Sequence, residues 1–130
     1  TCRDIQISEA AMDNVGNSQY LKELAEGLAS GQMRFDGLFV SGDVMAAEFI
    51  QYASSLGIRI PEDVQVVGFD DTFVSELTTP AITTIHQPLH EMAESAAEML
   101  VRAVKEKETP SSVVLPVSLI RRGSTSWESN

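Results

Sequence analysis

The most constraining feature of this sequence is a short apolar stretch, residues 64–69, that ends directly in two aspartates. Its valines and Phe69 favour a β-strand, and the stretch is too short for a helix. Nearly continuous apolar residues are typical of a parallel strand that is covered on both faces. Because open α/β sheets hold ligands outside the carboxyl ends of their strands, Asp70 and Asp71 stand where a binding residue is expected.

Strands and helices alternate along the chain. Apolar spacing and the Gly, Pro and Asp residues at the borders predict, in order, a strand at 4–7, a helix at 18–31, a strand at 35–41, a helix at 43–57, the strand at 64–69, a loop or short irregular helix at 72–80, a strand at 81–85, a long helix at 88–106, and strands at 113–115 and 117–120 on either side of Pro116. Asp43 is the expected N-cap of its helix. This order indicates right-handed parallel crossovers and a layered α/β fold with a parallel sheet.

Composition limits the possible partners. The chain has 130 residues, the size of one domain, and its net charge is -10. An excess of acidic side chains opposes contact with a phosphate backbone, so we do not expect this stretch to bind DNA itself. No apolar run is long enough to span a membrane. The single cysteine, Cys2, fits a reducing compartment but also fits many secreted proteins, and of these settings we expect the cytoplasm. Position 1 is Thr, so we expect the natural protein to begin upstream.

Polar residues at the strand ends are the candidate binding groups. Asp70 and Asp71 can accept hydrogen bonds from a small polar ligand, or one of them can hold a hard cation. The alternative is that they cap the following turn and are solvated. The turn at Gly42 and Asp43 is a weaker candidate, since an N-cap needs no further function. His86 and Gln87 end another strand and can reach the same rim, although His86 can equally be a packed histidine.

Catalysis has no support in the sequence, and the two histidines give poor support to a metal site. His86 and His90 are four residues apart, but Pro88 between them opposes their placement on one helix, so no metal site is expected. Arg121 and Arg122 can bind an anion, but paired arginines in a terminal strand are more often surface or interface residues. No Ser, His and Asp set has the pattern of a triad, and no cofactor is expected.

Two segments carry more apolar residues than a surface needs. They are the helix at 43–57 and the loop at 72–80, and they suggest a homodimer interface formed by Met45, Phe49, Tyr52, Phe73 and Leu77. The alternative is that both segments belong to the core.

Four segments together resemble the lactose-repressor (LacI/GalR) family of bacterial transcription regulators. They are residues 36–46, 57–72, 79–88 and 121–125, in matching order and spacing. The resemblance implies a truncated periplasmic-binding-protein-like subdomain, part of an effector-binding domain. Residues 1–86 and 117–130 would form the C-terminal subdomain, and residues 87–116 would cross into the N-terminal subdomain. The apolar face of that crossover would then be covered by a neighbouring copy, by domain swapping or by repacking.

The resemblance also implies roles for particular residues. Asp70 resembles the aspartate that accepts hydrogen bonds from the effector, and Gln87 resembles the crossover residue at the cleft. Asp43 matches the acidic residue of an Asn-Asp pair whose first position is here Gly42, a departure that removes an amide able to hold a sugar hydroxyl. A small polar effector, a sugar or related metabolite, is implied. DNA would be bound only by an N-terminal headpiece outside this chain, so the chain alone should bind neither DNA nor effector tightly.

Three function classes follow from these observations. The first is the effector-binding and dimerisation region of a transcription regulator. The second is a sugar-binding receptor of a transport system, which shares the fold. The third is a phospho-receiver domain, which also ends a strand in aspartates, but it needs a lysine after a later strand and no lysine lies between Lys22 and Lys105.

Overall fold

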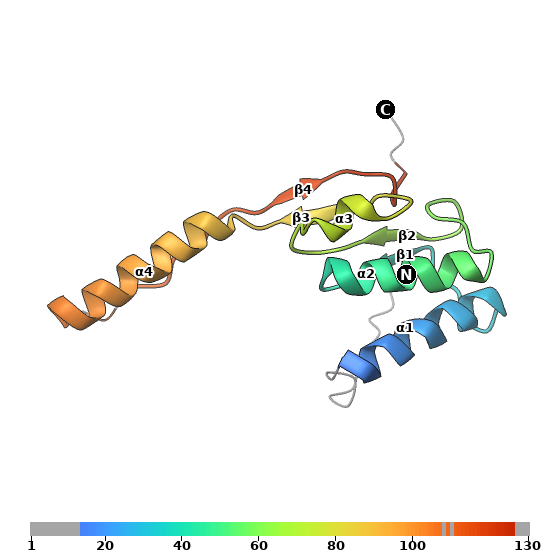
Figure 1. The fold of residues 1–130 in the computed structure, drawn as a ribbon, viewed down its shortest axis with the longest axis horizontal. Helices are drawn as coiled ribbons and strands as arrows, with labels where there is room; N and C mark the ends of the chain where they lie inside the picture. Colours follow the sequence, from blue (N-terminus) through green and yellow to red (C-terminus); the bar gives the residue numbers. More distant parts are fainter. Residues whose placement is uncertain (1–13, 108, 110, 127–130) are drawn as a thin grey trace.

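The computed structural model describes residues 14–107, 109 and 111–126, so the expected strand at 4–7 and Cys2 lie outside the described residues. Its elements are α1 (Asn14–Ala29), β1 (Gly37–Phe39), α2 (Asp43–Ser55), β2 (Gln65–Val67), α3 (Val74–Leu77), β3 (Thr84–His86), α4 (Leu89–Glu106) and β4 (Ser118–Ile120), as Figure 1 shows. The left-handed residues Gly31 and Gly57 follow α1 and α2, as expected for glycines at helix ends.

The strands lie in the order β1, β2, β3 and β4. β1 pairs in parallel with β2, placing Leu38 opposite Val66, and β3 pairs antiparallel with β4. Two parallel bridges join β2 and its continuation to β3, between Val67 and Thr83 and between Asp70 and His86. The prediction of a layered α/β fold with a parallel sheet is therefore confirmed.

α1 and α2 lie together on one side of the β1 and β2 pair, and α3 lies beside the strands near β3 (Figure 1). α1 and α2 contribute most of the buried apolar side chains, namely Leu21, Leu24, Ala25, Ala46, Phe49, Ile50 and Ala53. The strands and the segments next to them contribute Val40, Ile58, Val64, Val66 and Ile82. Val64 and Val66 belong to the apolar stretch that the sequence singled out, and both are fully buried. The core thus holds the strand whose end carries the two aspartates.

Two sequence predictions about local structure are wrong. The N-cap of α2 is Gly42, and Asp43 is the first residue of the helix, with its carboxylate directed toward other elements. Residues 113–115 form no strand, and no strand in the described part of the chain pairs with them. A β-prone apolar run becomes a strand only where another strand supplies its hydrogen-bond partners.

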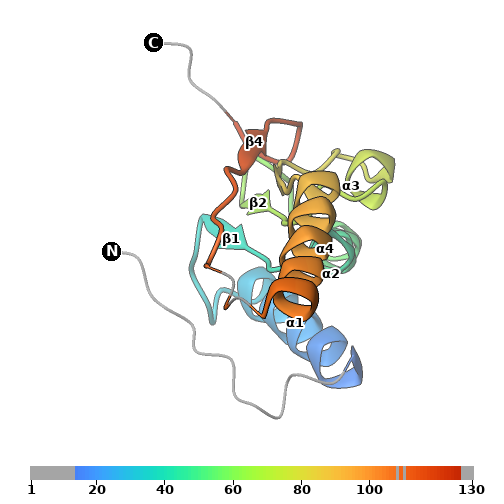
Figure 2. The same ribbon diagram turned by 90° about the vertical axis from the view of Figure 1, so that its left-hand side faces the viewer.

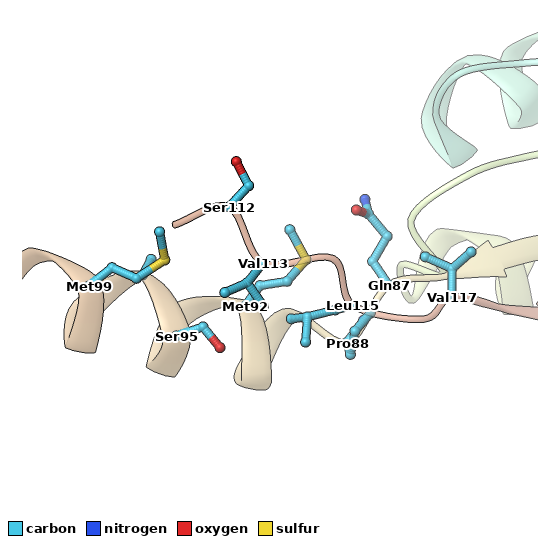
Figure 3. Close-up of a pocket in the computed structure, with 10 residues that line it drawn as sticks. Gln87, Pro88, Met92, Ser95, Met99, Ser112, Val113, Leu115 and Val117 are labelled. Atoms are coloured by element: carbon cyan, nitrogen blue, oxygen red, sulfur yellow. The ribbon is translucent and has the colours of Figure 1, made fainter. Parts of the chain in front are cut away.

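α4 extends away from the α/β body, and the segment before β4 runs back beside it (Figures 1 and 2). Between them lies a groove of about 440 Å³ whose walls include Met92, Met99, Val113 and Leu115 (Figure 3). Several apolar side chains of this arm are exposed, among them Leu100, Val104 and Val114. None of the helices in the described ranges is long and apolar enough to cross a membrane.

The polypeptide that follows β4 is built into the sheet at Ser124, which is fully buried. Its backbone accepts a hydrogen bond from the Val66 N–H at 2.9 Å and donates one to the Ala81 carbonyl at 2.9 Å. Its hydroxyl donates to the Val66 carbonyl at 2.6 Å and accepts from the Thr83 N–H at 2.8 Å. Ser124 therefore satisfies backbone groups of two neighbouring strand regions at once.

We predict that Ser124→Ala destabilises the chain, because it leaves the Val66 carbonyl and the Thr83 N–H buried without the hydroxyl. The expected loss in the free energy of unfolding is about 1 to 3 kcal/mol, measured by urea denaturation. Ser126→Ala, at an exposed position two residues further on, is the matched control and should change stability by less than about 0.5 kcal/mol. Equal losses in the two variants would contradict the role given to the hydroxyl.

Candidate functional site

The carboxyl ends of β2 and β3 come together and bring the predicted ligand groups into one place. Asp70 pairs with His86 in a parallel bridge, and the side-chain amide of Gln87 donates a hydrogen bond to Asp70 Oδ1 at 2.5 Å. Both Asp70 and Gln87 are half-buried. The structure thus joins two residues that the sequence could place only at the ends of separate strands.

The backbone at residues 70 and 71 is unusual for residues that carry a side chain. Asp70 has a φ of 97° and Asp71 a φ of 53°, which is the region that favours glycine. Hydrogen bonds hold this turn from several sides: the Asp70 N–H donates to the Ile85 carbonyl at 2.9 Å, and the Thr72 N–H donates to Asp43 Oδ2 at 2.6 Å. Such bonds offset a backbone conformation that costs about 1 to 3 kcal/mol per residue.

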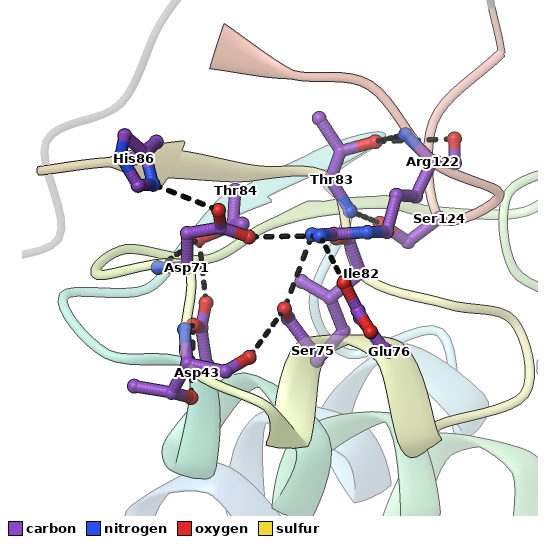
Figure 4. A network of polar contacts seen from close by, with 11 residues as sticks. Asp43, Asp71, Ser75, Glu76, Ile82, Thr83, Thr84, His86, Arg122 and Ser124 are labelled. Atoms are coloured by element: carbon purple, nitrogen blue, oxygen red, sulfur yellow. Dashed lines mark hydrogen bonds and ion pairs between the residues drawn. The ribbon is translucent and has the colours of Figure 1, made fainter. Parts of the chain in front are cut away.

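Asp43 is a structural residue of this region. Its side chain is 1% exposed, and its two oxygens accept hydrogen bonds from the Thr72 hydroxyl at 3.1 Å and the Thr84 hydroxyl at 2.6 Å, in addition to the Thr72 N–H (Figure 4). A Cβ atom at Gly68 would overlap Asp43 Oδ1, so the absence of a side chain there makes room for the carboxylate. Asp43 therefore ties α2 to the turn after β2 and to β3.

Arg122 is the residue that sequence reasoning underestimated. Its guanidinium donates to Asp71 Oδ1 at 2.8 Å, to the Ser75 hydroxyl and the Ile82 carbonyl at 3.1 Å, and to Glu76 at 3.2 Å (Figure 4). Asp71 Oδ2 contacts His86 Nδ1 at 2.9 Å. Because Arg122 and Asp71 are 51 positions apart in the sequence, no local pattern indicated that they pair.

The pKa of Asp71 lies below the ordinary value of a carboxyl group. Burial acts to raise this pKa, but the hydrogen bonds from Arg122 and His86 and the positive charge of Arg122 outweigh burial and lower it. Asp71 is therefore an ionised member of the network at neutral pH.

Acid should remove the contribution of Asp71 to stability. Its folded pKa lies below the unfolded value of about 3.9, so the contribution is present at higher pH and is lost as the pH falls through the folded pKa. Between about pH 5 and pH 2, the free energy of unfolding should fall less for Asp71→Asn than for the wild type, because asparagine does not ionise. Urea denaturation at a series of pH values measures this difference, and parallel curves would contradict the assignment.

Gly42 lies beside the Asp70 carboxylate. A Cβ atom built there would be 4.0 Å from Asp70 Oδ2 and 3.8 Å from the Met45 side chain, an ordinary contact in both cases. The backbone at position 42 is extended and suits any residue. Position 42 therefore borders the Asp70 carboxylate, and a Cβ atom would fit there without displacing it.

The residues predicted to form a dimer interface occupy different environments. Phe73 and Leu77 are 74% and 73% exposed, next to and within α3, and offer an apolar surface. Tyr52 is half-buried and bonds to Ser18 of α1 at 3.1 Å, while Met45 packs against the core. Phe49 is fully buried in the chain's own core, which leaves no side-chain surface for a partner, so we do not retain it in the interface.

The described residues contain no group of three His, Cys, Asp or Glu side chains arranged to hold a metal ion. The two histidines contact different elements: His86 bonds to Asp71, while His90 Nε2 lies 3.2 Å from Glu94 within α4. The polar side chains at the strand ends make hydrogen bonds to one another, and the side chains of Asp70 and Gln87 are of a kind that can bind a small polar ligand by hydrogen bonds.

Fold and site together define an α/β domain with a parallel sheet and polar side chains at its carboxyl edge. The chain belongs to the family of periplasmic binding protein-like domains, which matches residues 3–125. The predicted resemblance is thereby confirmed, and the phospho-receiver alternative is not retained.

Bacterial transcription regulators are among the proteins that the chain resembles. It is 32% identical to the ribose operon repressor of Bacillus subtilis (strain 168) over 126 residues, 96% of this chain and 38% of the repressor. In structure it is similar to the transcriptional regulator CelR in its cellobiose complex, with a TM-score of 0.75, 30% identity, and coverage of 87% of this chain and 34% of CelR. The chain thus spans little more than a third of the length of these two proteins.

The chain is also similar in structure to the lactose repressor. The Lac repressor dimer bound to operator and the anti-inducer ONPF has a TM-score of 0.72 and 27% identity, over 85% of this chain and 37% of the repressor chain. These relatives are regulators, which favours the regulator class over the transport-receptor alternative.

Proposed function

We propose that this chain is part of the effector-binding domain of a LacI-type transcription regulator and senses a sugar or related small polar metabolite. The observation that carries the proposal is the pairing of Asp70 with Gln87 at the carboxyl edge of the sheet, where α/β folds bind ligands. The cellobiose bound in the CelR complex supports a sugar as the ligand class.

The chemistry of the pair suits a hydroxyl-rich ligand. A carboxylate accepts hydrogen bonds from hydroxyl groups, and a glutamine amide can both donate and accept. Because the amide of Gln87 already holds Asp70 Oδ1, the carboxylate is oriented before any ligand arrives. Its Oδ2 atom faces the open position at Gly42, and this is where we place the ligand hydroxyl.

The arm formed by residues 87–116 belongs, in this proposal, to the N-terminal subdomain, with residues 1–86 and 117–130 in the C-terminal subdomain. The extension of α4 away from the body and its exposed apolar side chains support this division. The effector would bind between the subdomains and shift their closure, and this would change DNA binding by a headpiece outside this chain. Such a regulator would act in the cytoplasm without catalysis.

The test uses the longest polypeptide that the gene encodes around this chain. Calorimetric titration with cellobiose, ribose and glucose should show binding of a sugar, and Asp70→Asn should weaken it roughly 10- to 100-fold because a charge-assisted hydrogen bond is lost. Asp63→Asn, which changes an exposed carboxylate bonded to Arg59, is the control and should bind as the wild type does.

A gel-shift assay with DNA from upstream of the gene separates the function classes. A regulator binds this DNA and responds to the sugar, whereas a transport receptor binds the sugar and no DNA. Sugar binding that is unaffected by Asp70→Asn would contradict the proposed site.

We also propose that the chain forms a homodimer through Phe73 and Leu77, the apolar side chains exposed at α3. The double variant Phe73→Asp and Leu77→Asp should shift the sedimentation coefficient to that of a monomer, because it places charges in the interface. Leu100→Asp, at a 65% exposed position on α4, is the control and should leave the dimer intact. Dissociation by Leu100→Asp alone would instead favour domain swapping through the arm.

A further inference from the structure

We propose that Arg122 is a positioning residue of the candidate site: by binding the carboxylate of Asp71 it holds the turn at residues 70 and 71, and so fixes the Asp70 carboxylate against Gln87. This inference rests on the proposed function, because it assumes that Asp70 and Gln87 bind the effector. Arg122 lies in the segment at residues 121–125 that resembles the family, but nothing in that segment indicated its pairing with Asp71.

The guanidinium of Arg122 is held on several sides. It is 15% exposed, and its Nη1 donates to the Ser75 hydroxyl and the Ile82 carbonyl, both at 3.1 Å. Its backbone is fixed as well, because its N–H donates to Thr83 Oγ1 at 2.9 Å. The planar fork of an arginine keeps its donors in a rigid arrangement, so Nη2 reaches Asp71 in one defined direction.

Asp71 is held between the side chains of Arg122 and His86. Arg122 binds Oδ1 at 2.8 Å, and His86 Nδ1 lies 2.9 Å from Oδ2, so the carboxylate, 16% exposed, has a partner on each oxygen. The other charged group at this cluster is Glu76, which contacts Arg122 at 3.2 Å and is mostly exposed. Of the two partners of Asp71, Arg122 is the less exposed, with a side chain that is 15% exposed against 51% for His86.

The backbone transmits this position to Asp70. Two successive residues with positive φ are strained, and the strained state persists only while surrounding contacts hold it. When the Asp71 carboxylate is released, the turn can relax toward negative φ, which rotates the adjacent Asp70 side chain. The hydrogen bond from the Gln87 amide is then lost, and with it the prepared geometry of the site.

The experiment is heteronuclear NMR of the full chain without any sugar. The reporter is the side-chain amide of Gln87, whose bonded proton should resonate downfield of that in a free glutamine. Arg122→Gln should abolish this downfield shift. Asp71→Asn breaks the same ion pair from the other side while leaving Ser75 and Ile82 to Arg122, and it should abolish the shift as well. It also serves as the test if Arg122→Gln does not fold.

Two further variants separate positioning from general damage. Ser124→Ala disturbs the same terminal segment without touching the ion pair, and Arg59→Gln removes an exposed Arg–Asp pair far along the chain, in which Arg59 Nε donates to Asp63 at 2.9 Å. Both should keep the Gln87 shift. The proposal is overturned if Ser124→Ala removes the shift as fully as Arg122→Gln, or if neither Arg122→Gln nor Asp71→Asn moves it.

Because the NMR experiment contains no sugar, its outcome does not depend on whether the proposed function is correct. Failure to find a sugar that binds would count against the effector assignment, whereas an unmoved Gln87 resonance counts against Arg122 as a positioning residue. Arg122→Lys keeps the positive charge that binds Asp71. If this variant keeps the downfield shift that Arg122→Gln loses, the result supports the ion pair as the cause.

Discussion

The buried carboxylate of Asp43 is the interaction on which the arrangement of the strand ends depends. A charge with almost no exposure must be hydrogen-bonded, because an unpaired buried carboxylate is very costly. Thr72 and Thr84 supply these bonds, and Gly68 supplies the space. Through one side chain, these bonds connect the start of α2 with the turn after β2 and with the start of β3.

The return of the chain from its extended arm completes this edge. Ser124 inserts between β2 and the segment before β3, and Arg122, two residues earlier, binds Asp71. The same short segment therefore stabilises the sheet and holds the turn that carries Asp70. β4 connects the arm directly to this segment.

Much of the fold could be predicted from local sequence patterns. The apolar stretch at 64–69 is a buried strand region followed by two aspartates, and the helices lie close to where apolar spacing placed them, although α1 begins four residues earlier than expected. The meeting of Asp70 and Gln87 followed from a general rule for parallel sheets, supported by the family resemblance. Both depend on patterns within short windows of the chain.

Other features required the tertiary structure. Phe49 has the spacing of both a core and an interface residue, and only the packing of α1 onto α2 shows that it is enclosed. Residues 113–115 have strand composition but no partner strand among the described residues.

The sequence alone determined the order of the elements, the buried strand and the acidic residues at its end, because these follow from apolar periodicity and turn residues. Only the tertiary structure decided that the buried Asp43 side chain bonds to Thr72 and Thr84 and that Arg122 binds Asp71. These are contacts between residues 29 to 51 positions apart, and their energy depends on geometry that no local pattern contains.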